Sequence, residues 1–406
     1  MQLTFWHRAR YWVLLLLVVL ITISSHPTIV EISRSAGMES GTILSRYIVF
    51  VFGTLFLISI NMKSMLKPKE IRTCWLIYLW IALYYLLTFA IFGTKEMMKD
   101  LRYIAFCLIA IMIGWQLNME EKRFRMLLVV FAGMILFVGL MQVFVNIGGF
   151  VILDQYQTDN KNSLGVMLAT GATIFLVLGL NYHEKGFRKI LYIGLALLSL
   201  VVLLTIRARA STLVFGIMFL FIMFERYKGK NVVLYILLGL GVAVIVYLFL
   251  PESIKNFVHN SFYQHYEGGD ITTGRTDRNR TALNFLSDHI YLGNLRDEAN
   301  IGQIHNYPLN RTFEFGLIFV FPILLIYIYL LIKTFIYSIR SNNRNINTIG
   351  YYLLAIPFIV SMAEPTFPFG PGTATVFNFL VFGASLRNTY SESTVVNSAM
   401  ENTQSY

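Results

Sequence analysis

Long apolar stretches follow one another along the chain and are separated by short polar segments. A helix crosses the hydrocarbon core of a bilayer with about 20 mostly apolar residues, and by this measure we expect about 12 transmembrane helices. They begin near Tyr11, Ile43, Thr73, Leu101, Arg125, Ser163, Arg188, Ala210, Asn231, Glu314, Thr348 and Gly372. The pattern therefore predicts an all-α polytopic membrane protein.

One long polar stretch interrupts this pattern, between "PESIKNFVHN" and "YPLNRT". At about 60 residues it is too long for a simple connection between helices. We therefore divide the chain into helices 1–9 (residues 1–250), a large loop (251–312), helices 10–12 (313–386) and a polar tail (387–406).

The large loop contains one segment with helical periodicity, "TDRNRTALNFLSDHIYLG". Its apolar residues share one face of the expected helix, namely Ala282, Leu283, Leu286 and Ile290. Thr276 or Asp277 would cap the start of this helix, and Gly293 would end it.

Lysine and arginine gather in short segments between the apolar stretches, such as "NMEEKRFR", "NYHEKGFRK" and "ERYKGK". Because the cytoplasmic loops of membrane proteins carry such an excess, we expect both termini in the cytoplasm and the large loop outside. This distribution also accounts for the net charge of +11, so nucleic acid is not an expected partner. Two cysteines are too few for a disulfide framework.

Two arginines stand where this bias predicts none. Arg207 and Arg209, in "LLTIRARASTLVFG", fall at an outer junction between two apolar stretches. Arginine near the membrane interior is costly, so we expect an anion as its partner. If the segment is helical, the two side chains point about 200° apart and cannot serve one site equally. The alternative is that one or both reach the phosphates of lipid headgroups.

Three more arginines belong to the helix predicted in the large loop. Arg275 follows the turn at its start, and Arg278 lies on the same helical face, whereas Arg280 does not. Arg275 is therefore the first candidate for a ligand contact and Arg278 the second. A basic helix that lies on the membrane surface is an equally good interpretation of the spacing.

The segment "IGQIHNYPLNRTFEFG" places His305, Asn306, Arg311 and Glu314 directly before an apolar stretch. A histidine can take a proton from a hydroxyl group at physiological pH. Asn306 would orient this histidine or cap the helix that follows. The alternative is an ordinary loop histidine that is hydrogen-bonded to the backbone.

Asn162, beside Lys161, stands at the outer end of the sixth expected helix, where an asparagine is most simply a helix cap. The sequence suggests neither a metal nor a cofactor. Its closest carboxylates are adjacent or three residues apart, its histidines lack zinc spacing, and no Gly-rich phosphate loop is present.

Four of these segments occur in a recognisable order: "KNSLG", "RARAST", "TGR" and "HNYPLNRTFEFGLIF". In this order the chain resembles the O-antigen polymerase and O-antigen ligase superfamily. The resemblance covers roughly residues 161–319, and the flanking apolar stretches match only in hydropathy. Ala208 stands where the family has a serine before the junction arginine, and Arg207 is a second arginine at the same place.

The resemblance implies a GT-C-like membrane glycosyltransferase whose donor sugar is carried on undecaprenyl diphosphate, without a metal or cofactor. Arg209 and Arg275, followed by Arg278 and Arg207, would bind the diphosphate, and His305 would assist the acceptor hydroxyl. Supporting roles would fall to Asn306, Glu314, Asn162, Arg280 and Arg311. The expected location is the bacterial inner membrane, with the site facing the periplasm.

The resemblance favours a polymerase that joins oligosaccharide repeat units into a surface polysaccharide. Its partners would be the lipid-linked oligosaccharide, the bilayer, a chain-length regulator and other polysaccharide assembly proteins. The alternative is a ligase that transfers the glycan to a lipid A core or a protein. A flippase for lipid-linked glycans fits less well, because the ionisable residues cluster at the expected outer face rather than along a central path.

Overall fold

A computed structural model describes residues 11–16, 18–19, 22, 68–94, 96–116, 120–146, 161–181, 186–226, 252, 255–256, 275–296, 299–302, 304–340, 344–364, 369 and 375–387. These residues form helices and turns and contain no strand. The helices are α5 (Lys69–Phe92), α6 (Met97–Gln116), α7 (Glu121–Met141), a π-helix (Gln142–Asn146), α8 (Lys161–Asn181), α9 (Phe187–Thr205), α10 (Arg209–Arg226), α13 (Arg275–His289), α14 (Tyr307–Phe315), α15 (Leu317–Arg340), α16 (Arg344–Ser361) and a last helix at Thr375–Arg387.

Four of the described helices are long and apolar enough to cross a membrane: Lys69–Phe92, Glu121–Phe144, Phe187–Thr205 and Leu317–Ile336. Three shorter apolar helices accompany them: Leu164–Leu180, Ile349–Ser361 and Thr375–Arg387. The described part is thus a helical membrane protein, and the number of twelve spans stays a prediction. The helices expected from Ile43 and Asn231 lie outside the described residues, as does most of the one expected from Tyr11.

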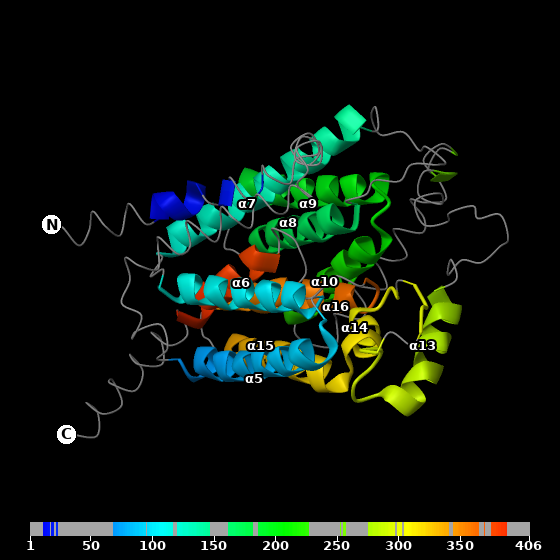
Figure 1. Cartoon of the computed structure of the whole chain (residues 1–406). Helices are drawn as coiled ribbons and strands as arrows, with labels where there is room; N and C mark the ends of the chain where they lie inside the picture. The colour runs from blue at the N-terminus through cyan, green and yellow to red at the C-terminus, as the bar shows by residue number, and fades with distance from the viewer. Residues whose placement is uncertain are drawn as a thin grey trace, which may run out of the picture.

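The long helices lie side by side in a bundle, with α8 at its centre (Figure 1). Helix α8 packs against α7, α9, α10 and α16, and its residues 164–179 are all buried. A helix that is apolar all round is typical of such a central position. Glycine allows close approach: the Cβ position of Gly171 lies 3.5 Å from the Cα atom of Ala132 in α7.

Helix α13 confirms the helix expected from the segment "TDRNRTALNFLSDHIYLG", but its apolar face was partly predicted wrong. Ala282 and Leu286 are buried in a small core with Ile304 and Phe313, which joins α13 to α14. Leu283 and Ile290, in contrast, are 57% and 41% exposed. The contact with α14 is narrow, so it covers only part of the stripe that the spacing defines.

The predicted ends of α13 are also shifted. The helix begins at Arg275, so Thr276 and Asp277 lie inside its first turn rather than at the cap. It ends at His289, and Gly293 instead belongs to the turn that follows, with a φ of +59°. Backbone hydrogen bonds tie this turn to the junction of α14 and α15, from Asn294 N–H to Phe313 O and from Leu317 N–H to Ile290 O.

The same junction explains the glycine of the "EFG" sequence. Gly316 separates α14 from α15 with φ +81° and ψ 167°, a conformation that is essentially restricted to glycine. A Cβ atom there would also lie 2.0 Å from the carbonyl oxygen of Tyr291. As a result Glu314, expected at the start of a transmembrane helix, lies in α14, and the long helix α15 begins at Leu317.

Gly316→Ala should therefore destabilise the protein by at least about 1–3 kcal/mol, from the backbone conformation alone. Thermal unfolding of the detergent-purified protein would measure this loss as a lowered Tm. The matched control is Gly194→Ala in α9, which is exposed, helical and has nothing within 4 Å of its Cβ position. A Gly316→Ala protein that melts with the wild type would contradict the assignment.

Candidate functional site

His305 lies between the start of α14 and the end of α16. Its Nδ1 atom is 3.9 Å from Oε2 of Glu364, whose side chain is 6% exposed. The side chain of Asn306 caps α14 by accepting a hydrogen bond from Leu309 N–H at 2.9 Å. Its Nδ2 donates to the carbonyl oxygen of Met362 at 3.1 Å. The predicted capping role of Asn306 is confirmed, and the same side chain joins α14 to the residues that follow α16.

The surroundings of His305 differ from those of an ordinary loop histidine. Its Nδ1 atom is buried and has no hydrogen-bond partner, so the backbone bond considered for it is not formed at that atom. The side chain is nevertheless 25% exposed, and this exposure belongs to side-chain atoms other than Nδ1. A buried carboxylate on the Nδ1 side favours a proton there and would leave Nε2 as the basic nitrogen.

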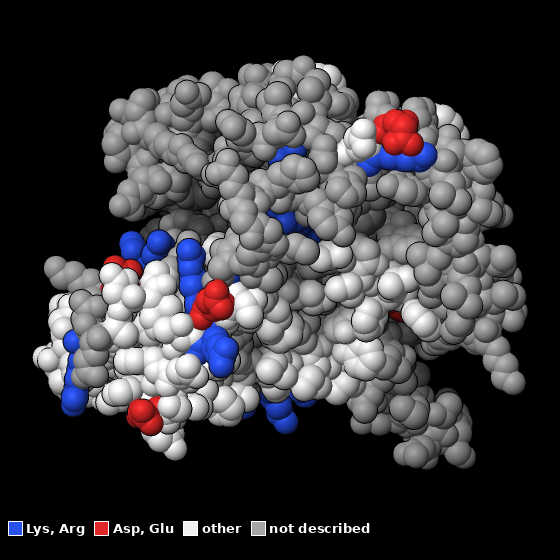
Figure 2. Space-filling model, turned by 90° about the vertical axis from the view of Figure 1, so that its right-hand side faces the viewer, with Lys and Arg blue, Asp and Glu red and all other residues white. Residues whose placement is uncertain are grey.

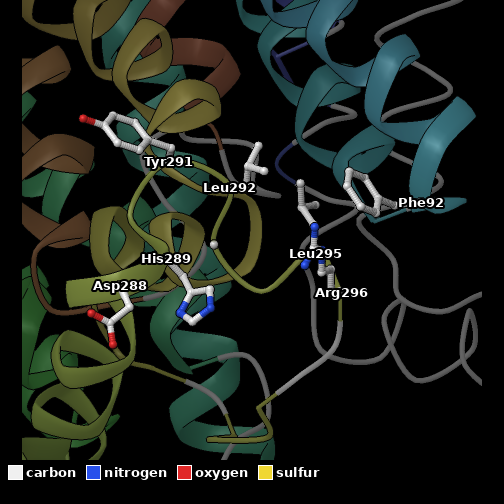
Figure 3. Close-up of a pocket in the computed structure, with 8 residues that line it drawn as sticks. Phe92, Asp288, His289, Tyr291, Leu292, Leu295 and Arg296 are labelled. Atoms are coloured by element: carbon white, nitrogen blue, oxygen red, sulfur yellow. The ribbon is translucent and has the colours of Figure 1, made fainter.

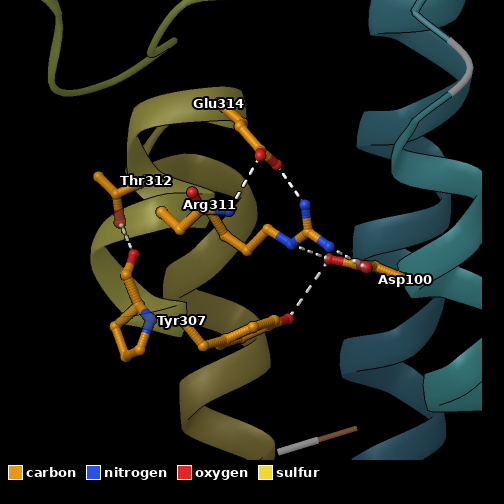
Figure 4. Close-up of polar contacts among 7 residues, drawn as sticks. Asp100, Tyr307, Arg311, Thr312 and Glu314 are labelled. Atoms are coloured by element: carbon orange, nitrogen blue, oxygen red, sulfur yellow. Dashed lines mark hydrogen bonds and ion pairs between the residues drawn. The ribbon is translucent and has the colours of Figure 1, made fainter. Parts of the chain in front are cut away.

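A largely buried ionic cluster joins α6 to α14, the helix that begins two residues after this histidine (Figure 4). Arg311 Nη2 donates to Asp100 Oδ1 at 2.9 Å, and Arg311 Nε lies 2.8 Å from Asp100 Oδ2 as an ion-pair contact without hydrogen-bond geometry. Arg311 Nη1 pairs with Oε2 of Glu314. The guanidinium also lies near the rings of Tyr307 and Phe315, with 5.7 and 5.5 Å to their centroids. The cluster joins α6 to α14, two elements that are far apart in the sequence.

The charge states of the cluster follow from burial and from its carboxylates. Burial of Arg311 opposes its positive charge, but Asp100 and Glu314 outweigh this effect and raise the pKa of the guanidinium. Burial, and then the charge of Asp100, raise the pKa of the Tyr307 hydroxyl well above its ordinary value. Tyr307 therefore stays protonated and donates to Asp100 Oδ2 at 3.4 Å.

Hydrogen bonds continue from the cluster to the histidine segment. Asn310 Nδ2 donates to Glu314 Oε1 at 2.9 Å, and Asn310 Oδ1 accepts from Ile304 N–H at 3.2 Å. Ile304 is fully buried and directly precedes His305. The backbone at the histidine is thus connected to Asp100 through three side chains of α14.

Arg207 and Arg209 lie where the chain turns from α9 into α10. Arg209 begins α10, whereas Arg207 has a φ of +55°, which is uncommon for a residue with a side chain. Both are half-buried. Because the turn interrupts the helix, the separation of about 200° expected for a continuous helix does not apply.

This turn packs against the beginning of α8. Ala208 is buried, and a Cβ atom on Gly165 would lie 2.5 Å from the Ala208 Cβ and 2.8 Å from the Ser211 Oγ. The "KNSLG" and "RARAST" segments therefore meet. Helix α8 begins at Lys161, so Asn162 lies in its first turn, and the side chain of Asn162 lies outside the described residues.

The arginines of α13 lie on a helix that packs against α14. Arg275 is half-buried at the start of α13, and Arg278 and Arg280 are exposed. Helices α13 and α14 and the turn between α9 and α10 lie toward the same end of the bundle (Figure 1). Figure 2 looks onto this end and shows basic side chains in several places across its described part.

A cavity of about 240 Å³ opens between the end of α5 and the turn after α13 (Figure 3). Phe92 lines it from α5, and the turn and the end of α13 provide Asp288, His289, Tyr291, Leu292, Gly293, Leu295 and Arg296. Sequence reasoning did not find this cavity, because its two sides are almost 200 residues apart. Within the part of the chain that the structure describes, no group of three or more His, Cys, Asp or Glu side chains could hold a metal ion.

Asp100, Tyr307 and Asn310 are site residues that the sequence analysis did not single out as functional. Asp100 is an acidic residue at the edge of an apolar stretch, "KDLRYIAFC", and this is the only sequence signal for it. No protein-family model matches the chain, and no curated protein is significantly similar to it in sequence.

Proposed function

We propose that the chain is a membrane glycosyltransferase that polymerises oligosaccharide repeat units carried on undecaprenyl diphosphate. The observation that carries the proposal is His305, with its unpartnered Nδ1 atom facing the buried carboxylate of Glu364 and its side chain partly exposed. The separation of 3.9 Å is longer than a hydrogen bond, but a carboxylate on the Nδ1 side would orient the ring as a general base once the two groups approach each other.

In the proposed reaction, the acceptor sugar hydroxyl gives its proton to Nε2 of His305 and attacks the anomeric carbon of the donor sugar. The bond between that carbon and the diphosphate oxygen breaks, and undecaprenyl diphosphate leaves with the electron pair. Glu364 stabilises the imidazolium that forms on His305. The charge that develops on the leaving diphosphate requires fixed cations, and Arg209 and Arg275 are the proposed pair, with Arg278 and Arg207 behind them.

The proposal places the site on the periplasmic side of a bacterial inner membrane. It retains twelve spans, both termini in the cytoplasm and the large loop outside. Support comes from the gathering of α13, α14 and the turn at Arg207 toward one end of the bundle, away from the starts of α7 and α9, which carry Lys and Arg in their first turns (Figure 1). A lipid-linked donor enters from the bilayer, and an acceptor glycan reaches the same end from the aqueous side.

A strain that lacks this protein, with and without the complementing gene, tests the proposal. Its glycans, separated by size, should be single repeat units on an otherwise normal acceptor, and complementation should restore the ladder of longer chains. Full-length polymer that stays on its polyprenyl carrier would show the ligase instead. A glycan profile identical to that of the wild type would exclude both activities.

A further inference from the structure

The ionic cluster of Asp100, Arg311 and Glu314 forms a brace, a set of contacts between α6 and α14 next to the segment that contains His305. Asp100 is buried in the first turn of α6 and holds the guanidinium of Arg311 with both carboxylate oxygens. Arg311 also holds Glu314, one turn of α14 further on. Taking the charges of Asp100 and Arg311 largely out of water is costly, and apolar residues of the same volume would often give equal or greater stability. A cluster of this kind is therefore better explained by the fixed orientation that it imposes on α14 relative to α6.

Hydrogen bonds hold the residues on both sides of His305. On one side, Glu314 holds Asn310, and Asn310 holds the backbone N–H of Ile304, which directly precedes the histidine. On the other side, Asn306 caps α14 and donates to the carbonyl oxygen of Met362, two residues before Glu364. The ring of His305 and the carboxylate of Glu364 are thus set against each other by these two attachments.

We propose that Asp100, Arg311, Glu314 and Asn310 are positioning residues, which hold the backbone at His305 so that its ring faces Glu364. The effect of this brace on catalysis rests on the proposed function, but its effect on the position of the backbone at His305 does not. Loss of the Asp100 charge should leave Arg311 with Glu314 alone, release α14 from α6 and let the segment of His305 open more often.

A cysteine-labelling experiment measures this opening without any enzyme assay. The chain has only two cysteines in its sequence, Cys74 and Cys107, and both are buried. A His305→Cys variant therefore reports on its own segment through its rate of reaction with a water-soluble maleimide. In the same protein, Asp100→Asn should raise this rate by about tenfold or more, because local opening exposes the thiol. The matched control is Ser287→Cys on the exposed side of α13, whose rate should not change with Asp100→Asn.

A milder variant guards against general unfolding. Glu314→Gln keeps the shape of a half-exposed side chain but removes the charge that Arg311 Nη1 contacts. If Asp100→Asn raises the labelling rates of the cysteines at both 305 and 287, the same two rates are measured with Glu314→Gln instead. Faster labelling at position 305 alone in that background supports the brace. Unchanged labelling at position 305 in both backgrounds would overturn it.

Kinetics then separate the brace from the proposed function. With His305 in place, Asp100→Asn should lower kcat by about 10- to 100-fold, because a small misplacement of a catalytic group is costly, while KM changes little. Asp100→Glu, which keeps the carboxylate, should recover much of this loss. A changed labelling rate in a protein whose wild type makes no polymer would support the brace and reject the glycosyltransferase. An active wild type whose kcat is unaffected by Asp100→Asn would reject the positioning role.

Discussion

His305→Ala is expected to lower the rate of polymer formation by about 10²- to 10⁴-fold, the range that general-base catalysis contributes. The substitution removes an imidazole whose Nδ1 faces a buried carboxylate and whose side chain is partly exposed. The rate would be measured with purified protein in lipid nanodiscs, from the first appearance of joined repeat units on a gel. His305→Gln offers a matched control, because it keeps a polar side chain of similar size that cannot act as a base.

Glu364→Gln sharpens the same test. If Glu364 acts only through His305, its substitution lowers kcat by itself but adds little in a protein that already carries His305→Ala, because residues that act as a unit are not additive. Losses that multiply in the double variant would show that Glu364 acts independently. Full activity of His305→Ala, in protein that elutes and melts like the wild type, would return His305 to an ordinary loop residue.

The parts of the structure that the sequence predicted are those that depend on neighbours in the chain. The helix at Arg275–His289 follows from its own periodicity, and the cap at Asn306 follows from its position before a Tyr-Pro pair. The break at Arg207–Ala208 was expected as a junction between two apolar stretches, although its left-handed residue was not. In each case the determining interactions lie within a few residues.

The contacts that make up the site could not be predicted in the same way. Asp100 meets Arg311 across 211 positions, and His305 meets Glu364 across 59, so both pairs exist only because α6 and the end of α16 pack beside α14. The exposure of Leu283 has the same origin, since α14 decides which part of the α13 stripe is covered. Helical spacing shows which residues share one face of a helix, but it does not show how much of that face a neighbouring helix covers.

The pair of arginines proposed for the diphosphate gives the second large expected effect. Arg209→Ala and Arg275→Ala should each lower the polymerisation rate by about 10²- to 10³-fold, the loss typical of one fixed group that stabilises transition-state charge. The two side chains are half-buried at the starts of α10 and α13, where the helix holds the base of the side chain in place. Single-turnover rates with the lipid-linked donor would separate this loss from weaker donor binding.

Two comparisons make the arginine prediction specific. Arg280 lies on the same helix as Arg275 but is exposed, so Arg280→Ala should cost much less than Arg275→Ala although the loss of charge is equal. Arg275→Lys should recover only part of the activity, because an ammonium group cannot replace the two parallel hydrogen bonds that a guanidinium gives to phosphate oxygens. Equal losses for Arg275→Ala and Arg280→Ala would mean that α13 contributes a general positive field, and the diphosphate contact would then have to be sought at Arg209 and Arg207 alone.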